Sequence, residues 1–161
     1  MESELIEIEK ENILRLLINE RFSTVLDIGC GTGVWSRMVT RFKPNASVLG
    51  VDISPLMIEE ARSRSGHRHE YLVHDCKKPL DIAPCDLILC AMSADYIGFG
   101  NVARLVSRGL SREGKALVWV RDPANYEIAS GKYIKKWNVF GRRVVESACA
   151  FDNAGAIASF R

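Results

Sequence analysis

The fold is decided by the stretch Val25-Leu26-Asp27-Ile28-Gly29-Cys30-Gly31-Thr32-Gly33. Together with Thr24, its first four residues form a short apolar run, which is typical of a strand buried on both faces of a parallel sheet. The glycines that follow allow a sharp turn and a close approach of the backbone to a ligand, because a Cβ there would clash or forbid positive φ. A strand, a glycine turn and a helix from Val34 up to Pro44 therefore open the predicted domain.

The same alternation of apolar runs and helical segments continues along the chain. Further strands are predicted at 46–52, 71–75, 86–91 and 116–120, with helices at 55–62 and 101–109 and a turn at 111–114. Short buried strands separated by helices indicate right-handed crossovers. The expected fold class is α/β, a doubly wound, mainly parallel sheet with helices on both faces, and an amphipathic helix at 3–20 is expected to pack on it.

Length and composition favour one domain over residues 1–161. A chain of 161 residues that is 47% hydrophobic can bury a self-sufficient core. Its 22 basic and 20 acidic side chains nearly cancel, which argues against a surface built to hold nucleic acid or anionic lipid. No apolar run reaches the roughly 18 residues that a membrane span needs, and the acidic start lacks a secretory pattern, so a cytoplasmic location without membrane contact is expected.

The cysteines and histidines predict no metal site. The five cysteines contain no C-x-x-C pair and their odd number does not suit a disulfide framework, which favours a reducing compartment. His67, His69 and His74 are interpreted as solvated or locally hydrogen-bonded imidazoles.

The candidate ligand site lies at the carboxyl ends of the predicted strands, where open α/β sheets bind ligands. Asp52 ends the strand at 46–52, where its carboxylate can accept both ribose hydroxyls of an adenosine. A dinucleotide loop reads G-x-G-x-x-G, whereas this loop reads G-x-G-x-G and is preceded by Asp27. A pyrophosphate disfavours a nearby carboxylate, but the ammonium of S-adenosylmethionine can be anchored by one, directly or through water. The loop therefore favours S-adenosylmethionine over NAD.

Two motifs resemble those of class I, Rossmann-like S-adenosylmethionine-dependent methyltransferases. The first is the opening stretch, the second is Gly50-Val51-Asp52-Ile53-Ser54-Pro55-Leu56-Met57, and the resemblance covers about residues 20–121. It implies that Asp75 and neighbouring backbone meet the adenine, that Ile53 and Met57 pack near adenine and ribose, and that Cys90 lies near the methionine end. The expected cofactor site comprises Asp27, Gly29, Cys30, Gly31, Thr32, Gly33, Asp52, Ile53, Met57, Asp75, Cys76 and Cys90.

The resemblance ends after the strand at 116–120. The family normally adds a helix and an antiparallel pair that closes the sheet, but only the substrate-side region 122–161 remains, with strands predicted at 137–140 and 143–146. Short or incomplete closing strands, and a truncated region, are alternatives that the sequence leaves open. Asp95 and Tyr96 are expected in the loop after the strand at 86–91, which the resemblance places near the methyl group. Capping or packing is the favoured interpretation of both residues, so the catalytic residues stay unassigned.

The expected function is methyl transfer from S-adenosylmethionine to a small-molecule acceptor, with release of S-adenosylhomocysteine. One alternative is an RNA or protein methyltransferase that uses the basic and aromatic segment 132–143, for which a solvated hairpin is the favoured interpretation. The signature N-P-P-[YF] of enzymes that methylate amino groups in nucleic acids is absent. Another alternative is a cofactor-binding partner subunit without catalysis. The sequence is compatible with a homo-oligomer.

Overall fold

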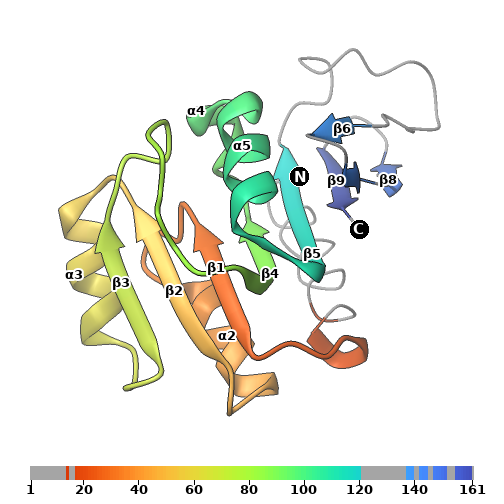
Figure 1. The fold of residues 1–161 in the computed structure, drawn as a ribbon. Helices are drawn as coiled ribbons and strands as arrows, with labels where there is room; N and C mark the ends of the chain where they lie inside the picture. The colour runs from red at the N-terminus through yellow and green to blue at the C-terminus, as the bar shows by residue number, and fades with distance from the viewer. Residues whose placement is uncertain are drawn as a thin grey trace.

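The computed structural model describes residues 14, 17–120, 137–139, 142–144, 147–151 and 155–160 (Figure 1). Its parallel strands are β1 (Thr24–Ile28), β2 (Ser47–Asp52), β3 (His69–Val73), β4 (Cys85–Cys90) and β5 (Leu110–Val120). Its helices are α2 (Val34–Phe42), α3 (Pro55–Ser63), α4 (Ala94–Ile97) and α5 (Phe99–Gly109). Leu14 and residues 17–19 are also helical, and the expected helix at 3–20 otherwise lies almost entirely outside the described residues.

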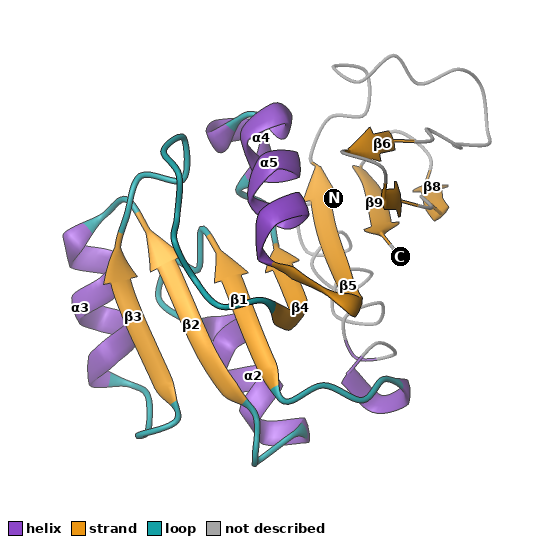
Figure 2. Ribbon diagram, in the orientation of Figure 1, coloured by secondary structure: helices purple, strands orange, loops and turns teal. Residues whose placement is uncertain are grey.

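The parallel sheet is packed on both faces, as the unbroken apolar runs predict. Strand β1 lies between β2 and β4, so alternate side chains of one central strand enter two different cores. Leu26 and Ile28 pack in the cluster that includes helix α5, whereas Val25 packs in the cluster that includes Val39 of α2. Figure 2 shows α2 and α3 on one face of the sheet and α5 on the other. The predicted doubly wound α/β architecture is confirmed.

The sheet carries an antiparallel closing pair, which the sequence had left open. Strands β8 (Ser147–Phe151) and β9 (Gly155–Phe160) extend it in the order β3-β2-β1-β4-β5-β9-β8, and β9 runs antiparallel to β5. The hairpin predicted on either side of Gly141 also forms, as β6 (Trp137–Val139) and β7 (Arg142–Val144). It makes a separate two-stranded sheet, so the closing strands are residues that sequence analysis did not assign.

Three local expectations were wrong. The predicted turn at 111–114 lies inside β5. Cys85 pairs with Leu110 and Leu87 pairs with Lys115, so residues 111–114 form an irregular bulge in the strand. Strand β3 spans 69–73, so Asp75 follows the strand in a turn instead of ending it. The segment at 94–97, expected as a loop, forms the one-turn helix α4.

Asp27 fastens strand β1 to the start of helix α2. The residue before the helix is Gly33, which has no side chain to cap it, and the Ser36 hydroxyl donates a 2.6 Å hydrogen bond to the Asp27 carboxylate. The Asp27 side chain is only 1% exposed, and this burial raises the pKa of its carboxyl from 3.8 to about 6, although the Ser36 hydroxyl and backbone N–H act in the opposite direction. The buried Asp27 carboxyl of β1 therefore fixes the first turn of α2.

Tyr71 of β3 fills the space behind the glycine turn. A Cβ on Gly50 would lie 2.5 Å from Tyr71 Cδ1 and 2.9 Å from Cys30 Sγ, and a Cβ on Gly33 would lie 2.5 Å from the Tyr71 hydroxyl oxygen. These distances are far below van der Waals contact, so the ring fits only because both positions are glycine. Packing behind the turn is thus set by Gly50 of β2, Tyr71 of β3 and the glycine loop itself.

The substitution Gly50→Ala should lower the free energy of unfolding by about 1–3 kcal/mol, because the added methyl overpacks the Tyr71 ring. The matched control is Gly66→Ala, whose Cβ would meet nothing within 4 Å, and its stability should stay within about 0.5 kcal/mol. Urea unfolding of both variants measures the difference. Equal stabilities would show that Tyr71 does not confine position 50.

Asp27→Asn should change the pH dependence of stability. The raised pKa means that the folded protein takes up a proton more readily than the unfolded chain, so the contribution of Asp27 is fully present below pH 3.8 and is lost as pH rises to about 6. The free energy of unfolding of the native protein minus that of the variant should therefore fall across this window and become constant above it. Urea titrations between pH 4 and 7.5 test this, and a difference independent of pH would contradict the assignment.

Candidate functional site

The carboxyl ends of four strands bring the predicted site residues to one edge of the sheet. The glycine loop 29–33 follows β1, residues 53–54 follow β2, residues 74–76 follow β3 and residues 91–93 follow β4. Because β1 lies between β2 and β4, the glycine loop is at the centre of this edge (Figure 1). The predicted residues therefore share one edge, as expected for an open parallel sheet.

The glycine loop has the backbone conformation that its sequence predicts. Gly29, Gly31 and Gly33 have φ values of +67°, +54° and +75°, in the region that favours glycine. The Gly29 and Cys30 N–H groups both donate to the Val51 carbonyl, at 2.8 and 3.0 Å. A Cβ on Gly31 would meet no atom within 4 Å, so the outer side of the loop faces open space. A ligand can therefore approach the main chain at this point.

Asp52 joins the glycine loop to the loop that follows β2. Its Oδ2 accepts a hydrogen bond from the Gly31 N–H at 2.9 Å, and its Oδ1 accepts one from the Ser54 N–H at 2.9 Å. An ionised carboxylate has about four acceptor sites, so about two remain for further donors. The Asp52 side chain is partly exposed, which leaves these sites within reach of a ligand.

Two apolar side chains stand exposed beside Asp52. Ile53 is 66% and Met57 is 44% exposed. Met57 is held at the start of α3, where its N–H bonds to the Ser54 hydroxyl and Pro55 occupies the first turn. Across the edge, Asp75 accepts the Lys77 N–H at 3.0 Å in a tight turn. The edge thus offers apolar surface on one side of Asp52 and a polar turn on the other.

Four of the predicted site residues have buried side chains, namely Asp27, Cys30, Cys76 and Cys90. Only their backbone atoms can meet a ligand at this edge without rearrangement. Burial raises the pKa of Cys76 to about 11 and that of Cys90 to about 12, and it raises the pKa of Cys30 as well. Because the thiolate is the reactive form, these cysteines are packing residues and not nucleophiles. Thr32 lies partly exposed in the loop, and its carbonyl accepts a 2.6 Å hydrogen bond from Arg37.

Sequence analysis missed Ser93, which contacts the glycine loop from the turn after β4. The Ser93 hydroxyl donates to the Ile28 carbonyl at 2.8 Å, and a Cβ on Gly29 would lie 2.4 Å from the Ser93 Cβ. A serine just before a short segment with an acid in its first turn is a helix-start signal that could have revealed α4. Nothing in the sequence indicates the long-range bond to Ile28.

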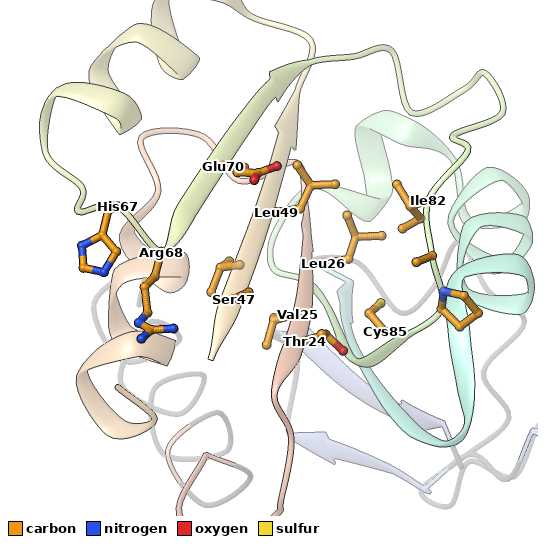
Figure 3. Close-up of a pocket in the computed structure, with 13 residues that line it drawn as sticks. Thr24, Val25, Leu26, Ser47, Leu49, His67, Arg68, Glu70, Ile82 and Cys85 are labelled. Carbon is orange, nitrogen blue, oxygen red and sulfur yellow. The ribbon is translucent and has the colours of Figure 1, made fainter. Parts of the chain in front are cut away.

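A groove of about 330 Å³ lies elsewhere, near the amino ends of the strands (Figure 3). Its lining includes Thr24, Ser47, Arg68 and Cys85, each at or next to the first residue of a strand. It forms because the connection 74–84 between β3 and β4 contains no helix to cover this part of the sheet. None of the predicted site residues lines it, so groove and candidate site are separate.

The described residues contain neither a group of three His, Cys, Asp or Glu side chains placed to hold a metal ion nor a helix long and apolar enough to cross a bilayer. His69 is hydrogen-bonded, with its Nε2 3.1 Å from the Thr40 hydroxyl and 3.2 Å from the Ser36 carbonyl. The Nε2 of His74 is buried without a hydrogen-bond partner among the described residues, so the interpretation of His74 as a solvated or locally hydrogen-bonded imidazole was wrong for this atom.

Comparison with curated proteins shows similarity to methyltransferases. The chain is 38% identical over 107 residues to a malonyl-[acyl-carrier protein] O-methyltransferase of Legionella pneumophila, a match that covers 64% of this chain and 38% of that protein. It is 29% identical over 139 residues to a demethylmenaquinone methyltransferase of Thermotoga maritima, covering 81% of this chain and 59% of that protein. The chain therefore matches less than two thirds of the length of either relative.

Solved structures share the fold. A methyltransferase from Thiobacillus denitrificans in complex with S-adenosyl-L-homocysteine superposes with a TM-score of 0.59 at 23% identity, covering 70% of this chain and 48% of that one. The PH0226 protein from Pyrococcus horikoshii superposes with a TM-score of 0.65 at 22% identity, covering 96% and 89%.

A family model described as a methyltransferase domain matches residues 25–114, from the strand before the glycine loop to the bulge of β5. This match includes Asp52, Asp75 and Ser93. Because it spans more than half of the chain, this protein belongs to the methyltransferase domain family, in its class I, S-adenosylmethionine-dependent form.

Proposed function

We propose that this chain binds S-adenosylmethionine at the carboxyl edge of its sheet and transfers the methyl group to a small-molecule acceptor, releasing S-adenosylhomocysteine. The observation that carries the proposal is the Asp52 carboxylate, which is fixed by the Gly31 and Ser54 N–H groups at 2.9 Å each and keeps acceptor capacity toward the open side of the loop. A ribose carries two vicinal hydroxyls. Their number and spacing match the acceptor sites that remain on the two carboxylate oxygens of Asp52.

The other parts of the cofactor fit the residues on either side of Asp52. The exposed side chains of Ile53 and Met57 offer the apolar surface that an adenine ring needs, and Asp75 with the Cys76 backbone offers polar groups for its edge. The amino-acid part would then extend over the glycine loop toward Cys90 at the end of β4. The proposed cofactor site contains the same residues as the site expected from the sequence. Asp27, Cys30, Cys76 and Cys90 contribute to it through their position or their backbone atoms.

Asp27 takes a supporting role in this proposal. Its carboxyl is buried beneath Ser36, so it does not face the cofactor ammonium directly in the present conformation. It fixes the first turn of α2 and with it the end of the glycine loop. The negative charge that it gains above pH about 6 lies under the loop, where it favours a cationic group bound above.

In methyl transfer, the main contribution of this chain is to position the methyl donor. The bound cofactor supplies an activated methyl group on a sulfonium, and an in-line displacement gains most from proximity and orientation. Asp52 and the glycine loop hold the donor in a fixed place, which is the contribution that the described residues supply. An acceptor that must lose a proton also needs a base, and no described residue is assigned that role.

A small-molecule acceptor is supported by the relative named for methylation of demethylmenaquinone. The other relative is named for O-methylation of a malonyl group that is carried on acyl-carrier protein. The RNA or protein alternative depends on the segment 132–143, of which only 137–139 and 142–143 are among the described residues. The proposal includes a cytoplasmic location, and a nucleic-acid partner is not favoured in it.

The isosteric substitution Asp52→Asn should weaken S-adenosylhomocysteine binding by roughly 10- to 150-fold, because hydrogen bonds to a charged group contribute about 1.5–3 kcal/mol. Titration calorimetry with S-adenosylhomocysteine and with NAD in parallel measures the effect. The control is Asp81→Asn, an exposed carboxylate in the connection between β3 and β4, which should leave the affinity unchanged.

Thermal unfolding without ligand separates a folding defect from a binding defect in these variants. Unchanged affinity in folded Asp52→Asn would show that Asp52 does not hold the ribose. Binding of NAD without S-adenosylhomocysteine would overturn the proposed function as a whole.

A further inference from the structure

The turn that follows β3 is anchored to helix α5 by the side chain of Arg104. Its Nη2 donates a 2.7 Å hydrogen bond to the carbonyl of Lys77, which lies 27 positions earlier in the chain. The same nitrogen donates to the Asn101 Oδ1 at 2.7 Å, and the Asn101 Nδ2 donates to the Ile97 carbonyl at 2.8 Å. A continuous line of hydrogen bonds therefore joins the end of α4, through α5, to the turn after β3.

Asp75 lies between this anchor and the sheet. The beginning of its turn is tied to β2, because the His74 N–H donates to the Asp52 carbonyl at 2.8 Å. The turn itself is closed locally, since the Asp75 Oδ1 accepts the Lys77 N–H at 3.0 Å. The connection 74–84 contains no helix that could hold the other end of the turn. That end is held at the Lys77 carbonyl, by Arg104.

The guanidinium of Arg104 is fixed in place at a cost. Its Nε is buried and has no hydrogen-bond partner within the described part of the chain. A buried donor without a partner is unfavourable, so other contacts must hold the group where it is. The two bonds from Nη2 are such contacts, and they come from one nitrogen of a planar group. Arg104 therefore acts as a fixed brace between α5 and the turn.

The place of Asp75 decides how an adenine would be recognised in the proposed function. Its Oδ1 is engaged with Lys77, which leaves Oδ2 as an acceptor for the exocyclic amino group of the base. A hydrogen bond weakens steeply with distance and misalignment, so a shifted turn would lose this contact. We infer that Arg104 is a positioning residue for base recognition, which holds the Asp75 turn against α5 so that the site prefers a base with an amino group. This inference rests on the proposed function.

The test compares S-adenosylhomocysteine with S-inosylhomocysteine, in which an oxygen replaces the amino group of the base, by calorimetry on the full chain. The native chain should prefer S-adenosylhomocysteine by at least about tenfold, the effect of one hydrogen bond to a charged group. Arg104→Met keeps the apolar stem and removes the donors. It should weaken S-adenosylhomocysteine binding by about fivefold and change S-inosylhomocysteine binding by less than about twofold.

Three further variants separate positioning from folding. Arg104→Lys keeps one donor for the Lys77 carbonyl, so it should retain the preference within about twofold of the native value. Asn101→Ala leaves Arg104 in place but removes its second acceptor, and it should lower the preference by about twofold even if Arg104→Met does not fold. The control is Arg108→Met, which changes an exposed arginine in the last turn of the same helix and should affect neither ligand.

Amide hydrogen exchange without ligand tests the anchor itself. The Lys77 N–H should exchange at least about threefold faster in Arg104→Met than in the native chain, because its turn has lost the tie to α5. The Cys30 N–H, which donates to the Val51 carbonyl at 3.0 Å, should keep its rate. Equal acceleration at both positions would show a general loss of stability and would contradict the inference.

The outcomes also separate the inference from the proposed function. If the native chain binds S-adenosylhomocysteine but either shows no preference between the two ligands or keeps its preference in folded Arg104→Met, the inference is overturned and the proposed function stands. If the native chain does not bind S-adenosylhomocysteine, the proposed function itself is wrong.

Discussion

The Asp52 carboxylate is the interaction on which the site depends. It accepts the Gly31 N–H from one loop and the Ser54 N–H from another, so one side chain fixes two backbone segments that follow different strands. Charge-assisted hydrogen bonds of this kind are stronger than neutral ones. They orient the same carboxylate oxygens that the proposed function assigns to the ribose. Because the anchor of the loops is also the proposed ligand contact, cofactor affinity and loop order are coupled at this residue.

The glycine loop is held in place by contacts with its neighbours. Tyr71 packs behind the loop, Ser93 contacts Gly29 from the turn after β4, and Asp27 accepts a hydrogen bond from Ser36 in the first turn of the helix that follows the loop. The loop is open above Gly31, where a Cβ would meet no atom within 4 Å. A loop confined on the remaining sides keeps its backbone in place before a ligand arrives, which lowers the ordering cost of binding. Rigidity of the loop therefore comes from three neighbours: Tyr71 on β3, Ser93 in the turn after β4 and Asp27 on β1.

The sequence predicted the features that rest on local patterns. The strand at 24–28 has the bounds expected from its apolar run, and the glycine loop and the placement of Asp52 follow from residue types. Contacts between distant residues could not be predicted. The hydroxyl of Ser93 on the Ile28 carbonyl, the exclusion of a side chain at Gly50 by Tyr71 and the closing pair β8–β9 all depend on packing across the sheet. Asp27 was expected near a ligand, but burial under Ser36 shows that its first role is structural.

In the proposed function the cofactor occupies the carboxyl edge of the sheet and not the groove at the amino ends of the strands. Amide chemical-shift mapping by NMR with S-adenosylhomocysteine tests it directly, because both places carry backbone N–H groups. We expect the largest shifts at Gly31 and Ser54, whose N–H groups bond to Asp52, with neighbouring shifts at Gly29 and Ser93. Shifts confined to Ser47, Arg68 and Glu70, which line the groove, would contradict it.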